Sequence, residues 1–424
     1  MFPGAGLQQT TSYKVVLPFY YYGAASFLIA CILLLLNTGV VQNHYFHPQT
    51  LAITHLMALG WATMIILGAS HQLLPVLIEG QLSSKALGHA SFLFAGLGIP
   101  LLVIGFYTFQ LGVILQTGAI LVNLGMLCYL LNVLVSIYES KRADIHAWFM
   151  AAASLWLFST TFLGLLLAFN FTHTWLPSDS VSYLSLHAHM GLAGWFLLLV
   201  IGVASRLIPL FLISKYTNDK LMWWIFILIN SGLLGFILLR YLGVNPRFFY
   251  TPFLLVLAAV ILFASFCFKA RKARIRKNVD RQMKLSLLAV LMLFLPLLAL
   301  IVVIFLLSGD SQPKVILLYG FTIFFGWLTA IILSMTFKTL PFIVWNKVYQ
   351  KRAVGKTPVP KELFSEMLFK AMAYCYLSGF AIFITGIIFL NDVLLKLGAI
   401  LLLAAAIFYV SNVGKIMFHR QKKL

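Results

Sequence analysis

The stretch His55-Leu-Met-Ala-Leu-Gly-Trp61 decides the fold, because it recurs at constant spacing along a chain of apolar segments. Residues 189–195 repeat its histidine, glycine and tryptophan 134 positions later. Residues 321–327 repeat the glycine and tryptophan a further 132 positions on, with Phe321 in place of the histidine. Each copy is followed at the same distance by a proline, namely Pro75, Pro209 and Pro341. Such regular spacing predicts three internal repeats.

The composition around these copies is that of a membrane protein. The 424 residues are 62% hydrophobic and only 9% charged, with a mean hydropathy of +0.99. Soluble domains carry about 25% charged residues, so this chain is neither soluble and globular nor disordered. A membrane helix needs about 20 apolar residues, and only helices or closed barrels satisfy their backbone in lipid. Helical spans are expected at about 15–41, 49–78, 86–109, 112–138, 143–169, 182–213, 221–242, 248–270, 284–308, 314–342, 364–389 and 391–417.

The repeat falls once in every four spans. We therefore expect an all-α polytopic protein whose 12 transmembrane helices form three pseudo-symmetric four-helix units, approximately 1–140, 141–280 and 281–424. Because four is even, the units enter the membrane in one orientation and share a pseudo-symmetry axis along its normal. The glycines of each copy either let helices approach closely or leave space for a flat ligand.

The charge distribution predicts the orientation. The formal charge is +20, and the basic residues gather near 139–142, 269–284, 346–361 and 419–423, which all follow even-numbered spans. By the positive-inside rule, both termini are expected to be cytoplasmic, in a bacterial cytoplasmic membrane, with the lipid bilayer as partner and no nucleic acid. No cleavable signal is expected, and the four scattered cysteines form no CxxC or CxxCH motif, so covalent c-type haem is not indicated.

Nine of the ten histidines precede residue 190, which makes them candidates for one site. The expected topology places most of them at the outer face: His44, His47, His55, His173, His187 and His189. A smaller set, His71, His89 and His146, lies toward the cytoplasm. Histidine inside a bilayer is costly, and neutral imidazole is a common ligand of metals and of haem iron.

His55 and His189 hold equivalent positions in two repeats and are expected to bind one haem iron or metal from both sides. His187 lies about 200° around the helix from His189, so it would address a different group on the opposite face. His44, His47 and His173 are candidates for an outer copper or metal site, and His71 with His89 for an inner ligand pair. In each case a hydrogen-bonded structural histidine is the alternative. All ten carboxylates lie in loops or at helix ends, which argues against strong proton pumping.

This arrangement resembles subunit I of the haem–copper oxidase superfamily, which includes the nitric oxide reductases. The block from His55 to Trp61, with Gly68 and Pro75, is similar to the second helix of that superfamily, whose histidine binds low-spin haem. The same frame resembles the NnrS family, twelve-helix proteins associated with haem, copper and nitric-oxide stress. The resemblance implies a low-spin haem ligand at His55; His189 is assigned by internal symmetry.

The chain departs from the oxidase pattern at several motifs. Residues 319–324 lack the His-x-His of the oxidases, and residues 245–247 stand where those proteins carry a His-His pair. The oxidase copper site and its tyrosine therefore do not transfer to this chain. Two functions are considered. The first is a haem protein that binds one or two b-type haems and, as an option, copper. It would act as an oxidoreductase in redox or O2- or NO-linked chemistry, with a quinol or cytochrome as the electron donor. The second is a non-redox permease or copper-handling protein that uses the outer histidines.

Overall fold

The computed structural model describes residues 11–39, 44–140, 143–275, 277–305, 312–350 and 357–421. These residues contain 12 helices long and apolar enough to cross a membrane, and their only β-type pairing is an isolated bridge between Ser214 and Arg274. The protein is therefore an all-α, multi-pass membrane protein, as the sequence predicted. Parts of the predicted basic clusters at 139–142, 269–284, 346–361 and 419–423 lie outside the described residues, namely 141–142, 276, 351–356 and 422–423.

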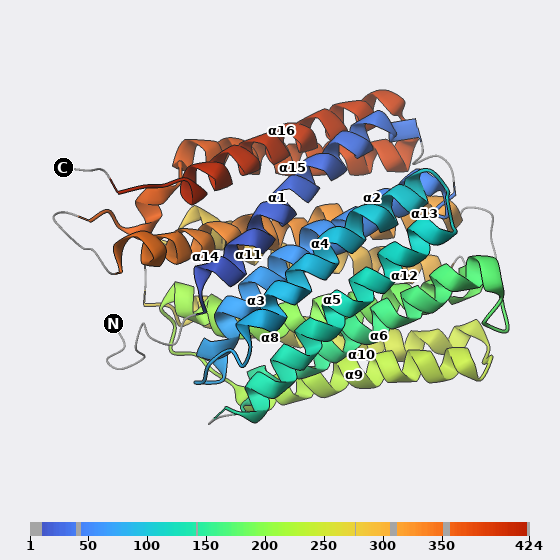
Figure 1. Ribbon diagram of the computed structural model, residues 1–424, viewed down its shortest axis with the longest axis horizontal. Helices are drawn as coiled ribbons and strands as arrows, with labels where there is room; N and C mark the ends of the chain where they lie inside the picture. Colours follow the sequence, from blue (N-terminus) through green and yellow to red (C-terminus); the bar gives the residue numbers. More distant parts are fainter. Residues whose placement is uncertain are drawn as a thin grey trace.

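The helices follow one another as an antiparallel bundle (Figure 1). Unit 1 contains α1 (Tyr13–Leu36), α2 (Pro48–His55), the π-helical segment η3 (Leu56–Thr63), α3 (Met64–Leu77), α4 (Lys85–Tyr107) and α5 (Val113–Tyr138). Unit 2 contains α6 (Ile145–His173), the 3-10 turn η4 (Ser180–Tyr183), α7 (Leu184–His189), the π-helical η5 (Met190–Leu197), α8 (Leu198–Leu212), α9 (Asp219–Tyr241), the 3-10 turn η6 (Pro246–Phe249) and α10 (Tyr250–Lys272). Unit 3 contains α11 (Arg281–Met292), α12 (Phe294–Phe305), α13 (Gln312–Phe321), the π-helical η7 (Thr322–Leu328), α14 (Thr329–Tyr349), the 3-10 turn η8 (Pro360–Leu363), α15 (Glu366–Phe389) and α16 (Asp392–Met417).

The second, sixth and tenth spans form the centre of the bundle. Their most apolar windows are 78, 72 and 61% buried, whereas no other described span exceeds 50%. We call these three spans the inner helices; they carry the three copies of the repeated stretch. Large apolar side chains such as Leu93, Ile261 and Leu298 are exposed on the outer helices, which is the surface a lipid bilayer covers.

Hydrogen bonds join the inner helices in a cyclic order. The indole Nε1 of Trp61 donates to Thr329 Oγ1 of unit 3, at 3.0 Å. Trp195 donates in the same way to Thr63 of unit 1, also at 3.0 Å. Thr63, Leu197 and Thr329 occupy equivalent places in the repeat, so two of three equivalent contacts carry a hydrogen bond. This cyclic contact is what a threefold pseudo-symmetry axis produces.

Each copy of the repeated stretch also forms a π-helical segment in the same frame. The segments begin at Leu56, Met190 and Thr322, directly after His55, His189 and Phe321. None of the three segments contains a proline that would predict such an interruption. The wider turn leaves some backbone carbonyls without a regular helical hydrogen bond, and side-chain hydroxyls donate to two of them. Thr329 Oγ1 donates to Phe324 O, and Tyr376 Oη donates to Gly326 O.

Glycines bring the third and fourth helices of a unit into backbone contact. A Cβ on Gly98 of α4 would lie 2.7 Å from Val122 N of α5, and one on Gly118 would lie 2.5 Å from Leu102 N. Unit 3 repeats this contact, since a Cβ on Gly379 of α15 would lie 2.9 Å from Leu402 N of α16. Small residues permit this close approach between membrane helices.

The start of α1 and the end of α16 lie at the same end of the bundle (Figure 1). Lys338, near this end of α14, forms a salt bridge with Asp280, the N-cap of α11, and lies 5.2 Å above the Phe211 ring. The ninth span differs from expectation: it is interrupted at Leu293, because Pro296 cannot donate a backbone hydrogen bond to residue 292.

Candidate functional site

A cavity of about 560 Å³ lies between the inner helices, toward the end of the bundle opposite the chain termini. His55, His187 and His189, the three histidines predicted to bind a cofactor, all line it together with Tyr319. Most other lining side chains are aliphatic or aromatic. A large apolar pocket with a few convergent polar groups is typical of a small-molecule or cofactor site.

Local structure fixes the orientation of His55. Helix α2 begins at Pro48, whose ring suits the first helical turn, and ends at His55. The Nδ1 atom of His55 lies 2.8 Å from Leu51 O, one turn earlier, and the ring stacks on Phe106 at 4.5 Å between centroids. A hydrogen bond from Nδ1–H to a carbonyl leaves Nε2 as the ligand atom, as in many metal sites.

His187 and His189 lie on the six-residue helix α7, whose start is held by the preceding loop. Asn170 of α6 donates to Ser178 O and accepts from Leu176 N. From α9, Arg240 donates to Ser182 O at 2.9 Å. Outside the membrane span, hydrogen bonds from Ser182 hold the pKa of Asp179 below its usual value, which favours the charged cap of the first turn.

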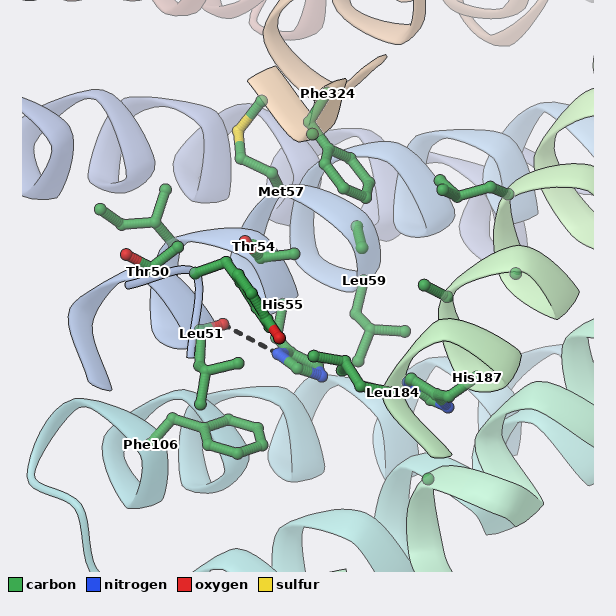
Figure 2. Close-up of a pocket in the computed structure, with 18 of the residues that line it drawn as sticks. Thr50, Leu51, Thr54, His55, Met57, Leu59, Phe106, Leu184, His187 and Phe324 are labelled. Carbon is green, nitrogen blue, oxygen red and sulfur yellow. Dashed lines mark hydrogen bonds between the residues drawn. The ribbon is translucent and has the colours of Figure 1, made fainter. Parts of the chain in front are cut away.

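The imidazoles of His55 and His187 face each other across the cavity. Their ring centroids are 6.3 Å apart and their planes differ by 24°. Figure 2 shows both rings directed into the pocket from different helices. First-row metals bind imidazole nitrogen at about 2.0–2.1 Å, so two imidazoles on opposite sides of one metal have centroids about 6 Å apart. The observed separation fits that arrangement.

Two further features of His187 fit a bound group. Its Nδ1 is buried and has no hydrogen-bond partner among the described residues. Its ring packs on Gly164 of α6, where a Cβ would lie 2.9 Å from Cε1. A buried ring nitrogen without a hydrogen bond costs about 1–3 kcal/mol, and the polar neighbour of this ring is the backbone of Thr160.

This pairing differs from the expected pairing of His55 with His189. The ring that faces His189 is Tyr319 of α13, at 6.1 Å between centroids and 23° between planes. In the cyclic arrangement, the histidine position of one unit faces the position two residues earlier in the next unit. Residue 187 is two before 189, and residue 319 is two before 321. The sequence revealed that 55 and 189 are equivalent, but not this offset between neighbouring units.

His189 is oriented as His55 is, with Nδ1 2.7 Å from Ser185 O. Its ring lies 5.0 Å from Phe236 of α9. Tyr319 was not proposed as a site residue, although its place two residues before Phe321 in the repeat was readable from the sequence.

The three outer histidines have separate surroundings. His44 Nδ1 accepts a hydrogen bond from Phe46 N, and the ring packs on Tyr45. His47 is the N-cap of α2, with a buried Nδ1 that has no partner among the described residues. His173 Nδ1 lies 2.6 Å from Thr172 Oγ1. No group of three histidine, cysteine, aspartate or glutamate side chains in the described part of the chain is placed to hold a metal ion.

The inner histidines also differ from one another. His71 is buried, with Nδ1 2.7 Å from Leu67 O and its ring stacked on Phe19, whereas His89 on α4 is exposed. His146 lies close to Gly202 O and Ser205 Oγ and so joins α6 to α8. An inner ligand pair of His71 and His89 stays a prediction.

No protein-family model matches this chain, and no curated protein matches it with significance.

Proposed function

We propose that the protein is a membrane haem protein in which His55 and His187 are the two axial ligands of a b-type haem. The observation that carries this proposal is the pair of facing imidazoles, 6.3 Å apart, at the wall of a large apolar cavity. An iron with two axial histidines exchanges electrons, and the low dielectric of such a pocket tunes its potential. A quinol or cytochrome is the proposed donor, in line with the resemblance to haem–copper oxidase subunit I.

The number of protein ligands favours a porphyrin over a bare metal ion. Structural metal ions take about four ligands, and catalytic ones about three from the protein. The described residues offer two facing imidazoles and no acidic or thiol ligand beside them. A macrocycle brings its own four equatorial nitrogens, so two imidazoles complete its coordination.

The cavity wall suits the rest of such a molecule. Leu102, Phe106, Leu115 and Ala119 present an apolar surface from α4 and α5. Arg240 lies at the wall from α9, and its guanidinium offers a charged partner for carboxylate groups. The chain's own residues thus bind, orient and shield the group from water.

The proposal is tested by the reduced-minus-oxidised spectrum of protein purified in detergent after expression with ample haem. We expect a b-type signal that His55→Ala abolishes. His173→Ala, which removes an imidazole outside the cavity, is the matched control and should leave the signal unchanged. If His55→Ala reduces expression, addition of imidazole to His55→Gly should restore the signal. Colourless wild-type protein would contradict the proposal.

A second candidate function, a permease or copper carrier, draws support from the π-helical segments, because interrupted helices at membrane depth mark many transporter sites. Two of the carbonyls in the segment η7, Phe324 O and Gly326 O, however accept hydrogen bonds from hydroxyl groups of the protein and so are not free to bind a solute. Uptake of copper or a solute into vesicles, unaffected by haem depletion, would favour the carrier.

A further inference from the structure

The loop after α8 and the loop after α10 are tied together at the end of the bundle where the chain starts (Figure 1). Ile275 N donates to Ile213 O at 3.1 Å, and Ser214 forms the isolated β-bridge with Arg274. Ile213 has a positive φ of 52°, which a β-branched residue adopts only where its surroundings hold it. The two loops are therefore fixed relative to each other. We call residues 213–218 and 273–275 the joined loops.

Large apolar side chains are exposed on and beside the joined loops. Ile213 is 55% exposed and Ile275 62%, although their backbones are hydrogen-bonded to each other. Trp223 and Trp224, in the first two turns of α9, are exposed as well. Tryptophan is enriched where a membrane helix meets the lipid headgroups. The joined loops are therefore expected at the depth where headgroups meet acyl chains, and their isoleucines offer apolar surface there.

Basic side chains are concentrated in the same region. Lys338 has a carboxylate partner in Asp280. Residues 265–279 contain no acidic residue, and Asp219 is the acidic residue within 213–224. Six exposed basic residues form no salt bridge with the part of the chain that the structure describes, namely Lys215, Lys220, Lys269, Arg271, Lys272 and Lys277. Their positive charge attracts an anion from outside the chain.

Arg274 lies in the bridge itself and has an unused donor. Its Nη1 donates to Arg271 O at 2.9 Å, whereas its Nε is buried and has no hydrogen-bond partner among the described residues. A buried donor on a charged group is costly when it lacks an acceptor. The planar guanidinium matches the oxygens of a phosphate, which accept two parallel hydrogen bonds from it.

We propose that the joined loops bind the headgroup of an anionic phospholipid. Arg274 binds its phosphate, the lysines around it compensate the charge, and Ile213 and Ile275 contact the first part of the acyl chains. A basic loop alone attracts anionic lipid without a fixed geometry. Here the β-bridge holds the arginine and both isoleucines in one place, which makes a defined site. The proposal does not depend on haem binding.

Native mass spectrometry of the full chain in detergent tests this site, with phosphatidylglycerol and phosphatidylcholine of identical acyl chains as probes. We expect the wild type to bind one phosphatidylglycerol about tenfold more tightly than phosphatidylcholine. Arg274→Gln should weaken phosphatidylglycerol binding about tenfold, as the loss of a charge-assisted hydrogen bond predicts. Lys85→Gln is the matched control: it removes an exposed charge at the same end of the bundle, at the start of α4, and should leave binding unchanged.

A second variant tests the apolar part of the site and covers the case in which Arg274→Gln does not fold. Ile275→Ser changes an exposed side chain, so the fold should be retained, and it should weaken phosphatidylglycerol binding severalfold. Inorganic phosphate at millimolar concentration should not displace the lipid from the wild type.

Three results would overturn the proposal. Equal affinity for the two lipids would show that the headgroup charge is not recognised. An equal effect of Arg274→Gln and Lys85→Gln would show attraction by overall charge without a site. Displacement by inorganic phosphate, with no effect of Ile275→Ser, would show a site for free phosphate and not for lipid.

Discussion

At the scale of single residues, two positions in the repeat determine which side chains line the cavity. His55, His189 and Phe321 occupy one equivalent place, and Ile53, His187 and Tyr319 occupy the place two residues earlier. At two interfaces the packing sets one place against the other: His55 faces His187, and His189 faces Tyr319. The same place in the repeat therefore presents different side chains to the cavity in different units.

Single-residue prediction from the sequence succeeded only in part. The constant spacing identified His55 and His189 as equivalent, and all three proposed cofactor ligands line one cavity. The pairing of His55 with His187 was not predictable, because it depends on how neighbouring inner helices are rotated and shifted. Side-chain packing between the units sets this rotation and shift, and the spacing of residues along the chain gives no information on it.

The tryptophan–threonine bonds give a stability prediction at this scale. Trp195→Phe removes the donor to Thr63 and leaves a buried hydroxyl without it, which should cost about 1 kcal/mol of stability. Thermal retention of folded protein in detergent, combined with Thr63→Val in a double-mutant cycle, measures the coupling. Trp327→Phe is the control: its equivalent partner is Leu197, so the loss should be smaller. Equal losses in both variants would contradict the cyclic hydrogen bond.

At the scale of elements, the π-helical segments are the feature that the sequence did not predict. They begin in the same frame in all three inner helices, next to the cavity. A π-helical turn widens the helix and changes the direction of the residues before it, and such turns are common at functional sites. Here they follow directly after the histidine positions.

The spans themselves were predictable, because a long apolar run leaves a chain in lipid few choices. The observed spans differ from the expected ones at two places. Pro296 interrupts the ninth span, and the tenth continues to Tyr349, well beyond the expected end near 342. Within the expected part of this span, the charge of Lys338 is compensated by Asp280.

The glycine contact between α4 and α5 predicts an effect on the cavity. Gly118→Leu would place atoms where Leu102 N lies 2.5 Å from a Cβ, so the two helices must separate. We expect a loss of about 1–3 kcal/mol, as in other overpacked contacts, and weaker haem retention, because Leu115 and Ala119 of α5 line the cavity. Heat stability and haem content measure these effects.

Gly235→Leu is the matched control for this prediction. Gly235 lies in α9, and a Cβ there would meet no atom within 4 Å. This variant should retain both stability and haem. If it lost as much of either as Gly118→Leu, close packing of α4 on α5 would not be the cause.

At the scale of the whole molecule, the net charge of +20 and the antiparallel bundle predict an orientation. An even number of spans places the start of α1 and the end of α16 at one end, and the cavity lies toward the other. By the positive-inside rule we predict that the cavity end faces the outside. The site would then be reached from the external side of the membrane.

Cysteine labelling tests this orientation. Ser83 and Ser178 are both exposed and lie in loops at opposite ends of the bundle. In a background without the four native cysteines, a membrane-impermeant maleimide should label Ser178→Cys in intact cells and Ser83→Cys only after permeabilisation. The reverse pattern would show that the cavity opens to the cytoplasm.

The central claim is that His55 and His187, and not His189, flank one haem iron. Electron paramagnetic resonance of the oxidised protein measures this most directly, because an iron with two axial imidazoles gives a characteristic low-spin signal. The account predicts that His187→Ala abolishes this signal and that His189→Ala retains it. A signal that persists in His187→Ala and disappears in His189→Ala would contradict the account.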